Sequence, residues 1–392
     1  MKISCWMTLA VNILTVKDPN PRTALLLPGL IGQFKNSEHG SLFLFLLNIY
    51  SIRAKLGARP RVWALACVFM LCACQQRPEA QSVTFSGPIM GTEYRITVVV
   101  PVADALDQLE LDILAEMNAV NSSMSTYLVD SELSQINRLP AYTPFVLSPE
   151  LNSVLSEALE ISELSQGAFD VTVADAVNLW GFGPNGTITA QPSPEQLVSL
   201  QASVGYKNLR LVNGSLSKVN AATKIDLSAI AKGYAVDQVA RMLKAKRFNN
   251  FLIDVGGELR LSGLNVDKRV WRVAIEKPQT LGGVQQVLEL TDAAIATSGD
   301  YRNFININGR KYSHTISPKT LKPVFHRLAL VSVISENAST ADALATALMA
   351  MGEAAALEFA RDKDLIAYFV IRGDDEGSYK VSYTDKFARF LQ

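Results

Sequence analysis

The chain has 392 residues, of which 48% are hydrophobic, enough for one large or two ordinary domains with a sizeable core. Its 37 basic and 37 acidic side chains balance, so the charge gives no reason to expect a nucleic-acid partner, which needs a basic face. All four cysteines lie at or before Cys74, which excludes a disulfide scaffold or a cysteine-bound metal in the remainder.

A basic and then apolar segment precedes Cys74. Basic residues over 53–61 come before an apolar run over 62–71, which is typical of a signal peptide and too short to span a membrane. The Leu-Cys-Ala-Cys sequence that ends at Cys74 resembles a bacterial lipobox, whose last cysteine is acylated. We therefore predict a lipoprotein signal peptide over 53–73 and a lipid anchor at Cys74 on the periplasmic side of a bacterial membrane. An ordinary cleaved signal, with Cys74 a bystander, is the alternative.

Residues 1–52 show no domain pattern, although 42–52 form a second apolar stretch. Because a signal peptide normally starts the chain, we interpret 1–52 as a non-native extension from a translation start set too far upstream. A long uncleaved leader is the alternative. The folded domain is expected over 74–392.

The domain itself mixes strand and helix patterns. Helices are predicted over 104–120, 150–165, 229–246 and 340–351, where apolar residues recur on one face. Strands are predicted over 82–100 (two strands and a tight turn), 223–227, 250–261, 270–276, 287–290, 294–297, 365–371 and 379–383. Adjacent strands of this kind favour an α+β fold with a mainly antiparallel sheet core and packed helices.

Several stretches carry more glycine and polar residues than packing requires: Gly167–Asp170, Asp226–Gly233, Asp254–Glu258, Ser313–Pro318 and Ala338–Ala343. In the last of these, a helix begins on which Asp342 and Thr346 stand four residues apart, so their side chains face the same way. Each stretch also has a plainer interpretation as a helix cap, a glycine turn, a first-turn acid or a structural histidine.

Taken together, the motifs resemble the ApbE family of FAD:protein FMN transferases over about residues 86–352. The matching stretches are Met90–Thr92, Met124–Tyr127, Asp130–Leu133, Gly167–Asp170, Leu179–Gly183, Asp226–Ser228, Lys232–Asp237, Val255–Gly257, Thr297–Tyr301, His314–Ile316 and Ala341–Ala343. The resemblance implies an ApbE-like fold and an enzyme that uses Mg²⁺ to cleave the pyrophosphate of FAD. FMN would pass through a phosphodiester bond to a threonine or serine hydroxyl of a partner protein, and AMP would leave.

The resemblance also assigns site residues. The FAD-binding positions are Met90, Tyr127, Ala168, Phe169, Asp170, Asp226, Lys232 and Ile316. The metal would be held by the Ala229 carbonyl, Asp342 and Thr346. Some family members have a second acidic ligand at the position of Ala345, so one coordination position is left here to water, a phosphate oxygen or a backbone group. A few oxygen ligands and substrate phosphates suit Mg²⁺.

His314 is our candidate general base for the attacking hydroxyl, because it titrates near neutrality, and Asp342 is the catalytic metal ligand. The aromatic rings of Tyr127 and Phe169 suit the flavin or adenine, or simple core packing. The implied partner is an exported flavin-acceptor protein, a subunit of a membrane redox complex. An FAD pyrophosphatase that gives FMN and AMP, and a non-catalytic FAD-binding protein, are the alternatives.

Overall fold

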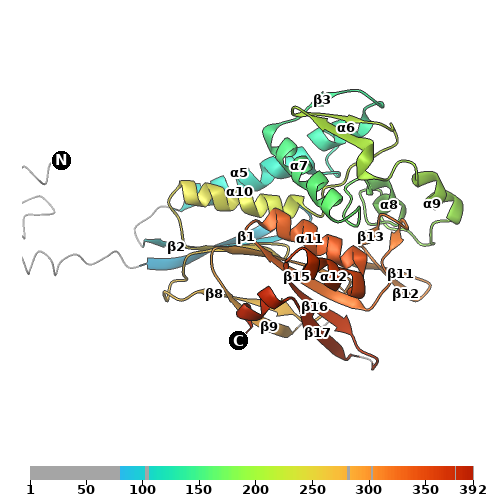
Figure 1. Cartoon of the computed structure of the whole chain (residues 1–392). Helices are drawn as coiled ribbons and strands as arrows, with labels where there is room; N and C mark the ends of the chain where they lie inside the picture. Colours follow the sequence, from blue (N-terminus) through green and yellow to red (C-terminus); the bar gives the residue numbers. More distant parts are fainter. Residues whose placement is uncertain (1–79, 102–105, 280–282, 302, 376, 392) are drawn as a thin grey trace, which may run out of the picture. The chain divides into compact units, whose positions relative to one another are not determined.

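The computed structural model describes residues 80–101, 106–279, 283–301, 303–375 and 377–391 (Figure 1). These residues belong to a compact unit that extends over Pro78–Gln392. The lipobox at Cys74, the signal peptide predicted over 53–73 and the extension predicted over 1–52 lie outside the described residues. Within the described part, no helix combines the length and apolar character needed to cross a membrane.

The centre of the fold is a large antiparallel sheet with strand order β1-β2-β6-β7-β10-β15-β16-β17. Its strands are Ala80–Ile89 (β1), Thr92–Pro101 (β2), Phe251–Val255 (β6), Glu258–Ser262 (β7), Ala293–Gly299 (β10), Leu328–Ser335 (β15), Ile366–Arg372 (β16) and Tyr379–Tyr383 (β17). Small sheets contain Phe145–Val146 (β3), Leu209–Val212 (β4), Ser215–Lys218 (β5), Trp271–Glu276 (β8), Val284–Leu290 (β9), Phe304–Ile307 (β11), Arg310–Ser313 (β12), Ile316–Ser317 (β13) and Lys322–Pro323 (β14).

Helices cover one face of the main sheet (Figure 1). They are Asp107–Met124 (α5), Glu132–Arg138 (α6), Pro149–Leu164 (α7), Ala174–Leu179 (α8), Pro194–Leu200 (α9), Ala231–Ala245 (α10), Ala338–Met351 (α11) and Glu353–Asp362 (α12), with 3-10 turns at Tyr206–Asn208 (η1) and Asp385–Phe390 (η2). The β8–β9 hairpin and η2 pack on the opposite face through a separate apolar cluster. The predicted α+β fold with an antiparallel core is confirmed.

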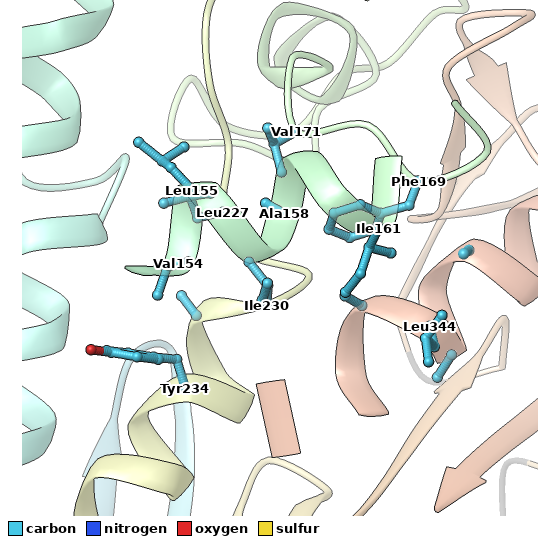
Figure 2. Packing of buried hydrophobic residues seen from close by; sticks show 14 of the residues in the cluster. Val154, Leu155, Ala158, Ile161, Phe169, Val171, Leu227, Ile230, Tyr234 and Leu344 are labelled. Carbon is cyan, nitrogen blue, oxygen red and sulfur yellow. The ribbon is translucent and has the colours of Figure 1, made fainter. Parts of the chain in front are cut away.

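Helix α11 lies at the centre of the helical layer. It packs against α10, α7 and α12 and against strands β10 and β15, and most of its side chains are buried. Alanine at positions 338, 341, 343, 345 and 347 favours the helix and lets neighbouring backbones approach closely. Leu344 also reaches the cluster that α7 forms with Phe169, Leu227 and Ile230 (Figure 2). The position of α11 is therefore fixed from several sides.

One predicted strand is wrong. Residues 223–227 form no ladder; within them, Lys224 makes only an isolated bridge to Val173. The side chain of Asn137 explains the extended pattern, because it accepts a hydrogen bond from the backbone N–H of Ile225 (2.7 Å) and donates one to its carbonyl (2.9 Å). A single amide group thus substitutes for a neighbouring strand.

Two loops lie near the candidate functional site. The segment Gly167–Asp170, which follows α7, leads through turns to the short helix α8. The stretch predicted as strand over 250–261 forms two strands, because Gly256 and Gly257 adopt positive φ angles of 67° and 103° and turn the chain. A Cβ on Gly256 would lie 2.9 Å from the side chain of Thr92, so this turn has room only for glycine.

Candidate functional site

A cavity of about 1250 Å³ opens beside the N-terminus of α10 and the face of α11 that contains Asp342 and Thr346. Its volume exceeds the usual range of small-molecule pockets, so it has room for a ligand as large as a dinucleotide. Of the sequence-predicted residues, the structure brings ten to its wall: Ala168, Phe169, Asp170, Asp226, Ala229, Lys232, His314, Ile316, Asp342 and Thr346. They come from segments up to 178 positions apart in the chain, and only the fold unites them.

The loop before α10 is shaped by Asp226. Its carboxylate accepts a hydrogen bond from the backbone N–H of Ser228 (2.8 Å) and a short one from the Ser228 hydroxyl. The backbone N–H of Asp226 donates to the Val171 carbonyl (2.8 Å), which ties this loop to the one that contains Asp170. Asp226 therefore organises the approach to the helix rather than capping its first turn.

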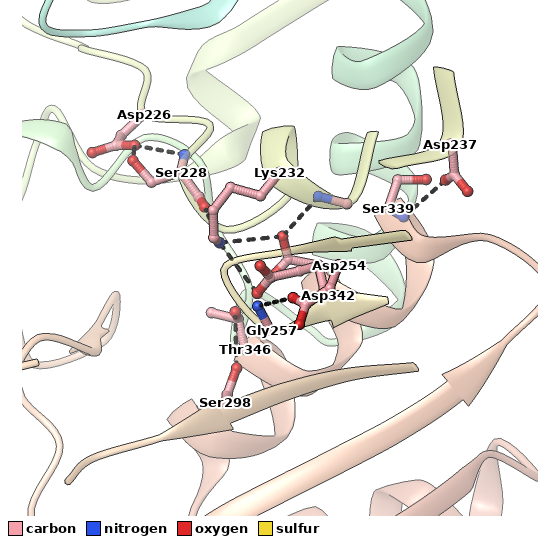
Figure 3. Close-up of polar contacts among 12 residues, drawn as sticks. Asp226, Ser228, Lys232, Asp237, Asp254, Gly257, Ser298, Ser339, Asp342 and Thr346 are labelled. Carbon is pink, nitrogen blue, oxygen red and sulfur yellow. Dashed lines mark hydrogen bonds and ion pairs between the residues drawn. The ribbon is translucent and has the colours of Figure 1, made fainter. Parts of the chain in front are cut away.

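Lys232, on the first turn of α10, is the centre of a charged cluster that it forms with Glu258 and Asp342 (Figure 3). Its amine lies 3.3 Å from Glu258 Oε1, 3.7 Å from Asp342 Oδ2 and 3.3 Å from the Ser228 carbonyl oxygen. Burial lowers the pKa of Lys232, but the charges of Asp342 and Glu258 outweigh this effect and raise it, so the amine is charged. Burial raises the pKa of both carboxyl groups, that of Glu258 to about 8, and the charge of Lys232 opposes the rise.

Asp342 and Thr346 lie one turn apart on α11 and both face the cavity, as their spacing predicts (Figure 3). Asp342 Oδ2 also accepts a long hydrogen bond of 3.3 Å from the backbone N–H of Gly233. The Thr346 hydroxyl lies 3.4 Å from that of Ser298 on β10. These weak contacts leave the oxygens of Asp342 and Thr346 able to bind a cation.

The start of α11 is held independently of the cavity. The buried carboxylate of Asp237 accepts hydrogen bonds from the backbone N–H groups of Ala338 and Ser339, both 3.0 Å long, and forms an ion pair with Arg260. Glu157 of α7 accepts hydrogen bonds from the hydroxyls of Ser339 (3.1 Å) and Thr340 (2.6 Å). These contacts fix where α11 begins and thus where Asp342 points.

Asp170 lines the cavity, but its carboxylate is engaged within the protein. It accepts hydrogen bonds from the backbone N–H (2.8 Å) and hydroxyl (2.5 Å) of Thr172 and from the Tyr206 N–H (2.7 Å). Burial raises its pKa, and these hydrogen bonds oppose the rise. The neighbouring Phe169 ring is 2% exposed and belongs to the core, which agrees with its plainer interpretation as a packing residue.

His314 faces the cavity from the loop between β12 and β13. Its Nδ1 lies 3.1 Å from the Asn303 carbonyl oxygen, which can only accept, so Nδ1 carries the proton and Nε2 has the lone pair. The Phe182 ring packs edge-on against the imidazole, with centroids 6.4 Å apart. Burial lowers the pKa of His314, so the ring stays neutral at lower pH than an ordinary histidine.

Two of the predicted FAD-binding residues, Met90 and Tyr127, are not among the residues that line the cavity in the described part of the chain. Met90 occupies the β1–β2 turn with φ of 49° and packs against the core. Tyr127 is 63% exposed, and its hydroxyl donates a 3.3 Å hydrogen bond to the carbonyl of Phe182, which does line the cavity. Tyr127 therefore lies at the rim, where its ring is free to cover a bound ligand.

Sequence reasoning missed Glu258 as a site residue. Its side chain lines the cavity, and Oε2 is buried without a hydrogen-bond partner among the described residues. The signal was present, because Glu258 directly follows the double glycine that turns the chain back at the cavity wall. An acidic residue directly after such a turn is therefore a candidate site residue.

The donor set fits a hard cation. Within the described chain, no three His, Cys, Asp or Glu side chains gather as a metal site would require, so the protein offers oxygen atoms of mixed kind. One carboxylate, one hydroxyl and the carbonyl of Ala229 match the way proteins hold Mg²⁺ together with substrate phosphates. Burial raises the pKa of Glu258 and Asp342, and a cation beside them would favour their ionised forms.

Known proteins share both the sequence and the fold of this chain. Residues 90–370 match the model of the ApbE family. The chain is 41% identical over 332 residues to the FAD:protein FMN transferase of Vibrio cholerae, covering 84% of this chain and 98% of that protein. It is 40% identical to the enzyme of the same name from Haemophilus influenzae, covering 80% and 92%. The structure of the flavin transferase ApbE from Vibrio cholerae superposes with a TM-score of 0.74 at 40% identity, over 80% of this chain and 100% of that one.

Proposed function

The chain belongs to the ApbE family, and from that premise we propose that it is an FAD:protein FMN transferase. The predicted family membership and ApbE-like fold are confirmed by the comparisons. The observation that carries the proposal is the meeting of Lys232, His314 and Asp342 at one cavity large enough for FAD.

The proposed reaction exchanges the phosphoanhydride bond of FAD for a phosphoester bond. A threonine or serine hydroxyl of the acceptor attacks the phosphorus of the FMN half of FAD. The new O–P bond forms as the bond to the bridging oxygen breaks, and AMP leaves with the electron pair of that bond. The hydroxyl proton passes to a base, so no oxidant or reductant is needed.

His314 supplies that base in our proposal. Its neutral ring, with Nδ1–H directed to Asn303, presents the Nε2 lone pair for the hydroxyl proton. The ammonium of Lys232 faces the same cavity and offsets negative charge on the pyrophosphate.

Asp342, Thr346 and the Ala229 carbonyl would hold Mg²⁺, which supplies charge neutralisation at the phosphates when it is bound. Met90, Tyr127, Ala168, Phe169, Asp170, Asp226, Lys232 and Ile316 remain the proposed FAD-binding positions. For Asp170 we now propose an indirect role, because its carboxylate shapes the loop that carries Ala168 and Phe169.

We also propose that the enzyme is held by lipid at Cys74 on the periplasmic side of a bacterial membrane. Its acceptor would then be an exported protein, such as a subunit of a membrane redox complex. Tethering enzyme and acceptor to one surface raises their effective concentration, so the anchor would assist the encounter.

A flavinylation assay tests the proposal. Purified enzyme, FAD and Mg²⁺ are incubated with an exported redox subunit that has a candidate acceptor threonine, and with its Thr→Ala variant as control. We expect flavin fluorescence on the denatured acceptor, loss of that signal in the control, and one AMP per flavin attached. Free FMN with AMP would instead identify the pyrophosphatase, and the absence of AMP would identify a binding protein.

A further inference from the structure

Two buried acids share the amine of Lys232. It lies 3.3 Å from Glu258 and 3.7 Å from Asp342. Both acids are almost fully buried, with side chains 6% and 5% exposed, whereas that of Lys232 is 25% exposed. Because both acids reach the same nitrogen, their carboxyl groups lie close together, and ionising both at once is unfavourable.

The two acids hold the amine unequally. Glu258 makes the shorter contact through Oε1, and its Oε2 is buried with no hydrogen-bond partner among the described residues. A buried carboxylate oxygen without a partner is costly, so it would be stabilised by an additional donor. Lys232 has three N–H donors on a flexible stem, and a small movement toward Glu258 would supply one.

We propose that Lys232 acts as a stand-in for the metal: it neutralises Asp342 until a divalent cation binds, and then shifts onto Glu258. An ammonium and a divalent cation repel each other at Asp342, so the amine must withdraw for the metal to bind tightly. Glu258 is then a positioning residue that receives the displaced amine and thereby sets metal affinity. The inference rests on the proposed function, since it takes Asp342 as a metal ligand.

Lys232 also contributes to the stability of this part of the fold. Among the described residues its amine contacts both buried acids, and removing it would be destabilising, as breaking a buried ion pair is. The contact of Lys232 with the Ser228 carbonyl (3.3 Å) anchors the amine from a side that is independent of both acids.

A double-mutant cycle tests the inference by metal binding alone. Mn²⁺ is titrated into wild type, Glu258→Gln, Lys232→Met and the double variant without FAD or acceptor, and free Mn²⁺ is measured by electron paramagnetic resonance. We expect Glu258→Gln to weaken Mn²⁺ binding, because the amine then stays on Asp342. Lys232→Met should tighten Mn²⁺ binding in both backgrounds. The factor by which it does so should be at least about five times larger in Glu258→Gln than in wild type, a coupling typical of groups in contact.

Equal effects of Lys232→Met in the two backgrounds would overturn the proposal, because Glu258 would then act only through its charge. If Lys232→Met alone does not fold, the double variant tests the proposal by itself. The proposal requires the double variant to bind Mn²⁺ more tightly than wild type. Weaker binding would overturn it and make Glu258 a direct ligand of the metal. Asp112→Asn is the matched control, since Asp112 pairs with Lys246 (2.6 Å) just beyond the other end of α10 and should leave affinity unchanged. No transferase activity enters these measurements, so they can fail while the proposed function holds.

Discussion

Replacing Gly233 by alanine should separate α10 from α11 and destabilise the protein. Gly233 lies in the first turn of α10, where its backbone N–H contacts Asp342. A Cβ at this position would lie 2.3 Å from the Ala338 carbonyl oxygen and 2.7 Å from the Ser339 Cα. Ordinary van der Waals contact would require the two helices to move apart by roughly 1 Å, since the obstructing atoms are backbone.

Two opposing effects set the magnitude. Alanine is favoured over glycine inside a helix by about 1 kcal/mol. Overpacking a rigid core costs about 1–3 kcal/mol, and the upper end applies here because Asp237 and Glu157 hold the start of α11 in place. The net expectation is a loss of about 2 kcal/mol in the free energy of unfolding.

Equilibrium unfolding in urea, followed by tryptophan fluorescence, measures this loss. The exposed position Lys244 on the same helix calibrates helix propensity, because Lys244→Ala and Lys244→Gly differ there without a packing clash. The Mg²⁺ concentration for half-maximal activity should also rise in Gly233→Ala, as Lys232 and Asp342 are drawn apart. A variant as stable as wild type would refute the close packing of the two helices.

Three further substitutions probe the site and the anchor. His314→Ala should lower kcat by about 10²–10⁴-fold at neutral pH. Because burial lowers the pKa of His314, the kcat of the wild type should fall only at a pH below the usual pKa range of histidine. The pH–rate profile of the variant should lack this fall at acidic pH. If the fall persists unchanged, it belongs to another group. Asp342→Asn should cost at least about 100-fold in Mg²⁺-stimulated turnover; unaltered Mg²⁺ dependence would remove Asp342 from the metal site. Cys74→Ala should release the protein from membranes on cell fractionation, and mass spectrometry of the wild type should find acyl chains on Cys74; an unacylated cysteine would contradict the anchor.

Local patterns predicted most of the elements around the site. The i, i+4 spacing of Asp342 and Thr346 placed both on one face of a helix, and the structure shows them at the same cavity. The double glycine at 256–257 was among the candidate glycine turns, and the structure forms that turn inside the stretch 250–261 that was predicted as strand, because positive φ angles favour glycine. These features depend on a few neighbouring residues, which is why sequence alone is sufficient for them.

Contacts between distant segments were not predictable in this way. Lys232 meets Glu258 and Asp342 only after α10, β7 and α11 have packed, and no local pattern encodes that meeting. Strand β15 was missed for a related reason: it is buried on both faces, so its residues show no alternation of apolar and polar side chains. Asn137 misled the prediction over 223–227 because a side chain can satisfy the backbone of an extended segment as a strand does.

The same charges imply that metal and FAD assist each other's binding. Lys232 balances the charge of one buried acid, burial raises the pKa of Glu258 to about 8, and His314 is neutral near pH 7, so the cluster has little net charge before any ligand arrives. The pyrophosphate of FAD is an anion, and it gains little from a cavity whose one ammonium is already paired. A divalent cation on Asp342 would make the cluster positive and so favour the pyrophosphate. Because coupling between two binding sites is reciprocal, FAD must tighten the metal by the same factor.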